Sequence, residues 1–273
     1  MFLALLSMGF GLTLRTVKFF NFAYGGAFLV GGYMMFWSYR SLEIAFLPSL
    51  LASLVLSGLY LLLSYKFIFC VLLKRRATNF VLLIASFGIL IATSSMLGMI
   101  FGSQATILAR HLSDINTFNI LGARLNIVQI IGIILVPIII SIFAYVRFKT
   151  NFGRATRALE DDSEVAELSG IPKEKTLNIL FFLSGSIAGL GGIMEGFDVG
   201  IIPASGLFFM LPVVVVVVLG GLKSFWGGII GAFILAIAAK STVFLFGGSW
   251  EQAVPFVILI IILLVRPEGL FRK

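Results

Sequence analysis

Charged residues are scarce in this sequence, and their scarcity excludes most classes of soluble protein. Only 12% of the 273 residues are Asp, Glu, Lys or Arg, against about 25% in an average soluble domain. Hydrophobic residues make up 60%, and the mean hydropathy is +1.12. Too few polar side chains remain to cover a globular surface, so we exclude a soluble enzyme, a disordered chain and a nucleic-acid-binding module. The composition predicts an all-α, polytopic membrane protein.

Cysteine and histidine each occur once, as Cys70 and His111. A single cysteine excludes an intramolecular disulfide and a cysteine-based metal cluster, and a single histidine argues against a histidine-based zinc or haem site. The sequence also lacks a Walker A loop, an HExxH pair and a plausible Ser/His/Asp set. We therefore expect no metal, no cofactor and no catalytic residue in this chain, and no ATP hydrolysis by the chain itself.

Long apolar runs separated by charged clusters define the expected membrane segments. A helix needs roughly 20 apolar residues to cross a bilayer, so the runs predict eight or nine transmembrane or re-entrant helices. The first run is short, and we expect about 10–20 further residues upstream of it. The runs are Met1–Leu14, Phe19–Tyr39, Ile44–Leu73, Asn79–Phe101, Ile127–Val146, Thr176–Met194, Leu207–Leu222, Phe225–Phe246 and Gln252–Val265.

Basic residues predict the orientation of these helices, because they collect in cytoplasmic loops. With Lys74, Arg75 and Arg76 in the cytoplasm, 16 of the 20 basic residues fall on that side, and so does the C-terminus. The pattern predicts one transmembrane domain over residues 1–273, with an external loop at 102–126 and a cytoplasmic loop at 147–175. The remaining basic residues are Arg40, Arg110 and Arg124 outside and Lys240 within a helix.

The cytoplasmic loop holds six of the twelve acidic residues together with six basic ones. Its Ala, Leu, Glu and Arg residues favour helix, Asp161 and Glu164 resemble a capping box, and Gly170 before Pro172 is a typical helix stop. We therefore expect one or two short helices here. They are either a solvated connection or a coupling helix that docks into a groove of a partner protein through small apolar residues such as Val165.

Polar residues beside glycines, or clustered within an apolar run, are candidates for a translocation path. The first group opens the second run, and the second group lies in the fourth run. Each has a simpler interpretation, because such groups also make helix–helix hydrogen bonds or bond back to their own helix. The candidates are Asn21, Tyr24, Gly25, Thr93, Ser94 and Ser95.

Four motifs occur in a fixed order along nearly the whole chain. They are Gly11-Leu-Thr-Leu14 with Asn21-Phe-Ala-Tyr-Gly25, Gly153-Arg-Ala-Thr-Arg-Ala-Leu159 through Ala166-Glu-Leu-Ser-Gly-Ile171, Val218-Leu-Gly-Gly-Leu222 with Trp226-Gly227, and Arg266-Pro-Glu-Gly-Leu-Phe271. Together they resemble the permease subunits of branched-chain amino-acid ABC importers, and the first motif is similar to the first of the two permeases in such systems. Tyr24 stands where the family usually has His, Gly26 where Glu is frequent, and Lys223 where Gly is usual.

This resemblance implies a function and a set of partners. The chain would be a permease subunit of an ATP-driven importer for branched-chain amino acids or related small polar solutes, in a bacterial or archaeal inner membrane. Its partners would be two cytoplasmic ATP-binding subunits, a second homologous permease and an external solute-binding protein, besides membrane lipid. The resemblance also implies that the cytoplasmic loop contacts the ATPase. The residues expected to couple the two are Arg154, Arg157, Glu160, Asp161, Glu164 and Gly170.

Several alternatives belong to other functional classes. A urea or short-amide ABC permease would keep the architecture and change the substrate. An ion-coupled secondary transporter would work alone, but no charged residue lies clearly in mid-membrane, which disfavours it. A passive channel would need no nucleotide, and a lipid-modifying enzyme would need a nucleophile facing a base at the interface. The sequence leaves open the exact substrate, the helices that line the pore, and whether the pore is homo- or heterodimeric.

Overall fold

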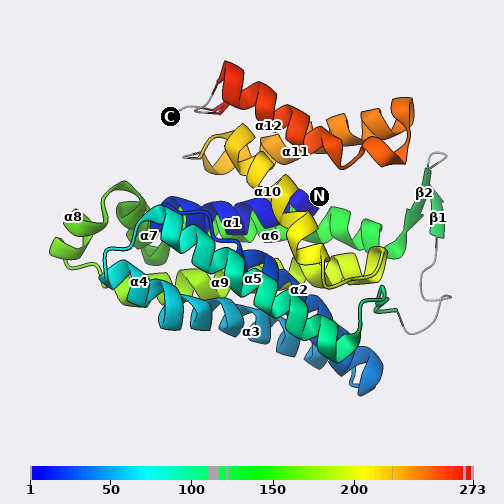
Figure 1. Cartoon of the computed structure of the whole chain (residues 1–273), viewed down its shortest axis with the longest axis horizontal. Helices are drawn as coiled ribbons and strands as arrows, with labels where there is room; N and C mark the ends of the chain where they lie inside the picture. Colours follow the sequence, from blue (N-terminus) through cyan, green and yellow to red (C-terminus); the bar gives the residue numbers. More distant parts are fainter. Residues whose placement is uncertain (1, 110–116, 121–122, 223, 267–268, 272–273) are drawn as a thin grey trace.

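A computed structural model describes residues 2–109, 117–120, 123–222, 224–266 and 269–271. Over these ranges the regular structure is helical apart from one short hairpin and an isolated β-bridge between Thr106 and Ile201, which confirms the helical class (Figure 1). The sequence predictions at His111 and Lys223, and parts of the external loop and the C-terminal tail, lie outside the described residues. The main helices are α1 (Phe2–Val17), α2 (Ala23–Met35), α3 (Phe46–Ser64), α4 (Cys70–Lys74), α5 (Asn79–Phe101), α6 (Ile127–Lys149), α7 (Asn151–Asp161), α8 (Ser163–Leu168), α9 (Lys173–Asp198), α10 (Ser205–Gly220), α11 (Phe225–Phe246) and α12 (Ala253–Val265).

Five helical stretches are long and apolar enough to cross a bilayer, which confirms a multi-pass membrane protein. Three shorter apolar helices, α1, α10 and α12, also match predicted runs, but length and composition alone do not establish eight or nine crossings. Two π-helical segments lengthen the apolar helices: η1 (Phe36–Ser41) continues α2, and η2 (Tyr65–Phe69) joins α3 to α4. The five long stretches are Phe46–Lys74, Asn79–Phe101, Ile127–Lys149, Lys173–Asp198 and Phe225–Phe246.

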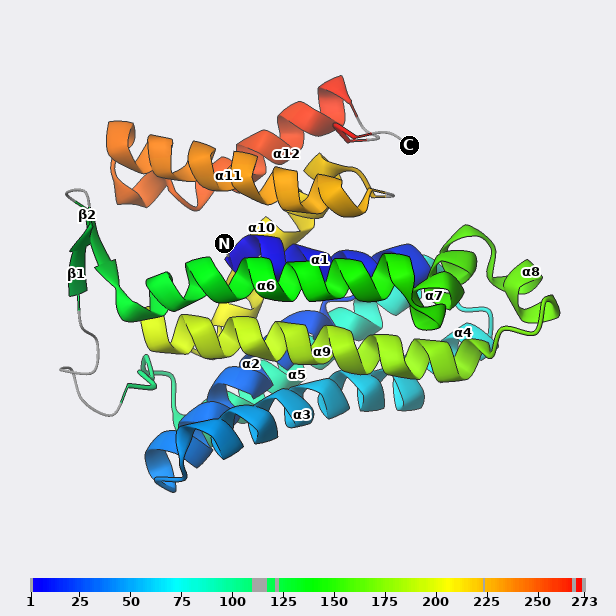
Figure 2. The ribbon, with the colours of Figure 1, turned by 180° about the vertical axis from the view of Figure 1, so that it is seen from behind.

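The centre of the bundle is α9, which is far more buried than the other long helices. It packs against α1, α2 and α3, and Figure 2 shows it between α6 and α3. Glycines permit this close packing, because a residue without a side chain lets two helix backbones approach. A Cβ at Gly31 of α2 would lie 2.6 Å from the carbonyl oxygen of Gly189, and one at Gly192 would collide with the carbonyl oxygen of Phe28.

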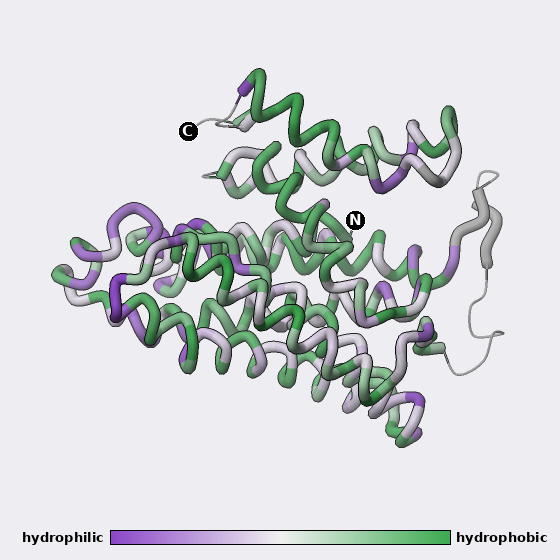
Figure 3. Tube along the Cα trace, in the orientation of Figure 1, coloured by the Kyte–Doolittle hydropathy of each residue, from purple (hydrophilic) through white to green (hydrophobic). Residues whose placement is uncertain are grey.

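The two ends of the bundle differ in character. Helices α7 and α8 lie at one end, and the hairpin of β1 (Thr117–Ile120) and β2 (Ala123–Asn126) lies at the other (Figures 1 and 2). The hairpin pairs Thr117 with Asn126 in antiparallel register. Hydrophilic residues gather at the α7–α8 end, whereas the long helices between the ends are mostly hydrophobic (Figure 3). A polar end therefore adjoins an apolar middle, as expected of a bundle that crosses a bilayer.

Candidate functional site

The charged loop at residues 147–175 contains two helices, α7 and α8, joined by a single residue. Thr150 starts α7, because its Oγ1 accepts a hydrogen bond from the N–H of Gly153 at 3.2 Å. Asp162 interrupts the helix with an extended backbone (φ −148°, ψ 114°) and then starts α8. The loop is thus an ordered pair of short helices, as the sequence predicts, and their angle is set at one residue.

The N-terminal cap of α8 is Asp162. Its Oδ1 accepts hydrogen bonds from the N–H groups of Glu164 at 2.8 Å and Val165 at 3.1 Å. The predicted capping box of Asp161 with Glu164 is wrong by one residue. Asp161 is still the last residue of α7, because the backbone continues helically until the N–H of Asp162 bonds the carbonyl of Ala158.

The C-terminal end of α8 confirms the predicted glycine stop. Gly170 has a positive φ of 85°, a conformation that glycine adopts without strain. Its N–H donates to the carbonyl of Glu167, and the N–H of Ile171 donates to the carbonyl of Ala166. This pair of bonds is a Schellman motif, which closes the last turn of a helix.

The Asp162 cap predicts that α8 frays in acid. The N–H groups of Val165 and Glu164 hold the pKa of Asp162 below its usual value. A carboxyl with a lowered pKa stabilises the folded helix above its unfolded pKa of about 3.9 and loses that effect as the pH falls through the folded pKa. We expect amide hydrogen-exchange protection of residues 163–169 to fall in that range. Asp162→Asn, a neutral cap, should remove the pH dependence, whereas Asp162→Ala should lower protection at neutral pH and show little further loss in acid. Wild-type protection of Asp162→Ala at neutral pH would contradict the capping role.

The residues predicted to couple to an ATPase differ in exposure. Arg157 is half-buried, with its guanidinium carbon 5.6 Å from the centroid of the Phe148 ring. Glu160 is almost buried and accepts two hydrogen bonds from Arg147. Their coupling roles stay predictions. The four exposed members of the predicted set are Arg154, Asp161, Glu164 and Gly170.

Two apolar side chains on α8 face away from the bundle. Val165 is 58% exposed and Leu168 is 89% exposed, and they lie three residues apart, on one side of the helix. Leu159 and Ala166, two further apolar residues of the same helices, are instead buried and hold the two short helices against the bundle. Exposure separates the two groups, and no sequence signal distinguishes them because all four are apolar residues on short amphipathic helices.

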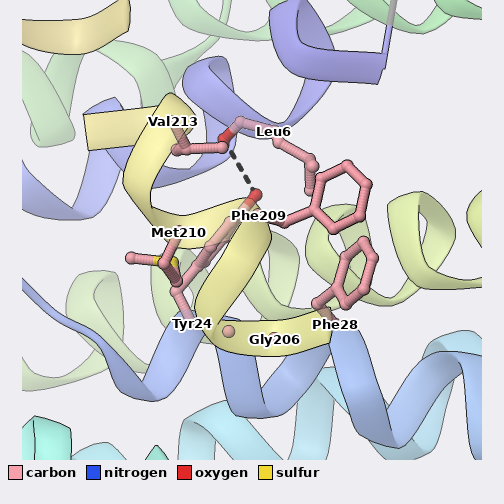
Figure 4. A pocket seen from close by; sticks show the side chains of 8 residues that line it. Leu6, Tyr24, Phe28, Gly206, Phe209, Met210 and Val213 are labelled. Carbon is pink, nitrogen blue, oxygen red and sulfur yellow. Dashed lines mark hydrogen bonds between the residues drawn. The ribbon is translucent and has the colours of Figure 1, made fainter. Parts of the chain in front are cut away.

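The first candidate group for a translocation path lies where α1, α2 and α10 meet. Tyr24 is buried, and its hydroxyl donates to the carbonyl of Leu6 at 3.0 Å (Figure 4). Asn21 is also buried, and its Oδ1 accepts from the N–H of Ala23 at 3.1 Å. A Cβ at Gly25 would lie 2.6 Å from the carbonyl oxygen of Gly206, so this glycine permits contact between α2 and α10.

A small cavity of about 10 Å³ lies beside these residues. Its free space accommodates about one water molecule, so an amino acid does not fit in this conformation. The first candidate group therefore serves packing in this state, and its role in a path stays a prediction. The lining residues are Leu6, Tyr24, Gly25, Phe28, Gly206, Phe209, Met210 and Val213 (Figure 4).

The second candidate group lies on α5. Thr93 shares a hydrogen bond of 2.7 Å with the hydroxyl of Tyr60 on α3, and Ser94 donates to the carbonyl of Pro203 at 2.7 Å. Ser95 is exposed on the surface of the bundle. The simpler interpretation, bonding back to the same helix, holds for Thr93, which also donates to the carbonyl of Ile89.

Tyr60 also accounts for Gly26, the unusual glycine that follows the first motif. A Cβ built at Gly26 would collide with the Tyr60 hydroxyl. Any side chain at position 26, including a glutamate, would therefore displace Tyr60 from its bond with Thr93. The sequence did not single out Tyr60, because its partner is on another helix 33 residues away.

The apolar helical bundle and its ordered polar loop define a multi-pass membrane protein. Over residues 1–263 the chain matches the family described as "Branched-chain amino acid transport system / permease component". The chain belongs to this family, which is a family of transport components and not of enzymes.

Relatives match along almost the whole length. A probable branched-chain amino acid transport permease protein LivH from Methanocaldococcus jannaschii is 28% identical, and the match covers 98% of this chain and 88% of the relative. The high-affinity LivH permease of Salmonella typhimurium is 23% identical, over 99% and 91% of the two chains. Among solved structures, PsaBC from Streptococcus pneumoniae shares the fold, with a TM-score of 0.52 at 14% identity, over 98% of this chain and 89% of that one.

Proposed function

We propose that this chain is a permease subunit of an ATP-driven importer of branched-chain amino acids. The observation that carries the proposal is the family match over residues 1–263, supported by LivH relatives that align from end to end. Two cytoplasmic ATP-binding subunits would supply the energy, and an external solute-binding protein would deliver the substrate. A second homologous permease would complete the pore. ATP binding would bias the helices between two states that open to opposite sides.

We also propose nine crossings of an inner membrane, with the α7–α8 end and the C-terminus in the cytoplasm. Basic residues support this orientation, because Lys74, Arg75 and Arg76 and six basic residues of the 147–175 loop would face the same compartment. The 16 residues of α1 and of α10 span about 24 Å at 1.5 Å per residue. Local thinning of the bilayer would accommodate these short helices.

The exposed apolar side chains of α8 support a coupling role for the loop. Val165 and Leu168 would insert into a groove of an ATP-binding subunit, a common way for a short amphipathic helix to be recognised. Exposed acidic residues of the same loop, such as Asp161 and Glu164, would then lie at the rim of the contact.

Competition during uptake tests the substrate assignment. In cells that lack the chain and its neighbouring transport genes, restoring them should restore uptake of labelled leucine. We expect unlabelled isoleucine and valine to compete for that uptake and urea or acetamide not to compete. Competition by urea as strong as that by valine would instead support the short-amide permease. Restoring every gene except the one for this chain is the control, and it should give no uptake.

A further inference from the structure

A buried ion pair ties α7 to the end of α6. Arg147 Nη1 donates to Glu160 Oε1 at 2.8 Å, and Arg147 Nη2 donates to Glu160 Oε2 at 2.7 Å. The two side chains are only 7% and 11% exposed. A guanidinium that bonds both oxygens of one carboxylate fixes the relative orientation of the two groups, which a single bond does not. The end of α7 is therefore held at a defined angle to α6.

The same cluster reaches α1 and α11 through one aromatic ring. The guanidinium carbon of Arg147 is 5.5 Å from the centroid of Phe225, the first residue of α11, and that of Arg15 on α1 is 6.0 Å from it. Arg15 Nη1 also donates to the carbonyl of Ser224 at 2.9 Å. Two cations thus contact the ring that starts α11, and one of them holds the carboxylate of Glu160.

The charges in this cluster do not balance internally. Of the two arginines, only Arg147 bonds a carboxylate in the described part of the chain, that of Glu160. Arg15 donates instead to the Ser224 carbonyl. The Nε atoms of both are buried without a hydrogen-bond partner among the described residues. Near this ion pair, α7 packs directly against the backbone of α6. The contact is so close that a Cβ at Gly153 would collide with the carbonyl oxygens of Val146 and Arg147. Loss of Glu160 would leave two neighbouring cations without an anion, so the four elements depend on this one carboxylate.

We propose that Arg15, Arg147, Glu160 and Phe225 form a joint that carries movement of α7 to α1, α6 and α11. In this arrangement Glu160 is a positioning residue inside the permease and not a contact of the ATP-binding subunit. The proposal rests on the proposed function, because it assigns a route to the movement that ATP binding produces. A partner bound to the exposed side of α8 would displace α7. The buried ion pair would then move the adjoining ends of α1, α6 and α11 together with α7.

The exposed ion pair of Lys74 with Glu174 provides a matched control. Its N–O distance is also 2.7 Å and it also joins two helices, but its side chains are 69% and 68% exposed. An exposed ion pair contributes little to the stability of a protein, whereas removing one partner of a buried pair is strongly destabilising because the other charge is left unpaired. The same substitution, Glu to Gln, can therefore be compared at both sites.

The test uses the complete transport complex in liposomes and measures solute imported per ATP hydrolysed. We expect Glu160→Gln to lower this ratio about tenfold, a typical coupling between contacting charged groups, while ATP hydrolysis continues. Glu160→Asp, which keeps the charge, should retain part of the ratio, and Glu174→Gln should retain all of it. A simple folding role would lower the yield of complex and leave the ratio unchanged.

An assembled Glu160→Gln complex with the wild-type ratio would overturn the proposal. If that variant does not assemble, the double variant Arg147→Met with Glu160→Met removes both buried charges, an exchange that folded proteins often tolerate. A lowered ratio in the double variant supports the joint. A wild-type ratio, or failure to assemble, overturns it. A wild-type complex without any ATP-driven uptake would instead defeat the proposed function.

Discussion

Leu168→Glu is expected to abolish ATP-driven uptake and to leave the membrane bundle folded. Leu168 is 89% exposed at the end of α8, so its side chain contributes almost nothing to packing within the chain. If it fills an apolar groove on an ATP-binding subunit, a carboxylate there would be desolvated without a partner. Removing a central anchor of an interface costs about 2 kcal/mol or more, a factor of about thirty in affinity. Binding of the purified ATP-binding subunit to the permease measures this loss.

Two further variants sharpen this experiment. Leu168→Ala shortens the side chain without adding charge and should weaken binding by an intermediate amount. Ser169→Glu adds the same charge one residue later, at the exposed cap of α8, and should leave binding within a few-fold of wild type. The melting temperature of the permease alone should be unchanged in all three. Wild-type binding by Leu168→Glu would refute the docking role of α8.

Gly31→Ala is expected to destabilise the whole bundle. A methyl group at this position would lie 2.6 Å from the carbonyl oxygen of Gly189, and backbone cannot move aside as a flexible side chain can. Helices α2 and α9 would have to separate at a contact where both glycines are buried. Overpacking of this kind costs about 1–3 kcal/mol, and we expect the upper end of that range. Thermal unfolding of the purified chain in detergent provides the measurement.

Gly88→Ala on α5 is the control for that substitution. A Cβ at Gly88 would meet nothing within 4 Å, and the residue is exposed in the middle of a helix. Alanine is favoured over glycine in a helix by about 1 kcal/mol, so this variant should be as stable as wild type or more stable. If Gly31→Ala and Gly88→Ala unfolded at the same temperature, the packing of α2 against α9 would not depend on the close glycine contact.

The sequence predicts the ends of the membrane helices well where an apolar run is flanked by polar residues or glycine. The predicted runs Asn79–Phe101 and Phe225–Phe246 coincide with α5 and α11, because each lies between a turn or polar residue and a glycine. The first run is predicted to stop at Leu14, before Arg15. The helix continues to Val17 because Arg15 is accommodated by the Ser224 carbonyl and the Phe225 ring. That contact joins residues more than 200 positions apart, so no local pattern reveals it.

The loop at residues 147–175 shows the same limit at closer range. Its composition predicts helices and a glycine stop, and both are present. The sequence predicts a cap at Asp161, but the cap is Asp162. The pattern does not distinguish the two, because adjacent aspartates are equally suited to cap a helix. Nor did it separate Glu160 from its acidic neighbours. Glu160 is distinguished by Arg147, which lies 13 residues earlier in another helix.

The candidate path residues show a second limit of prediction from the sequence. The sequence singles out Asn21, Tyr24 and Gly25 as polar and small residues in an apolar run and predicts that they line a translocation path. The structure places them in a tightly packed junction with α1 and α10. Whether a helix lines a pore would depend on the proposed second permease and on a second conformational state, and neither is encoded in the periodicity of one chain.

Uptake by purified components in sealed liposomes tests the central claim most directly. The permease, its homologous partner and the two ATP-binding subunits are reconstituted with external solute-binding protein, and labelled leucine is measured inside against time. We predict accumulation above the outside concentration only with ATP and all components present, and none when an ion gradient replaces ATP. Uphill accumulation by this chain alone, without any ATP-binding subunit, would contradict the account and identify a secondary transporter.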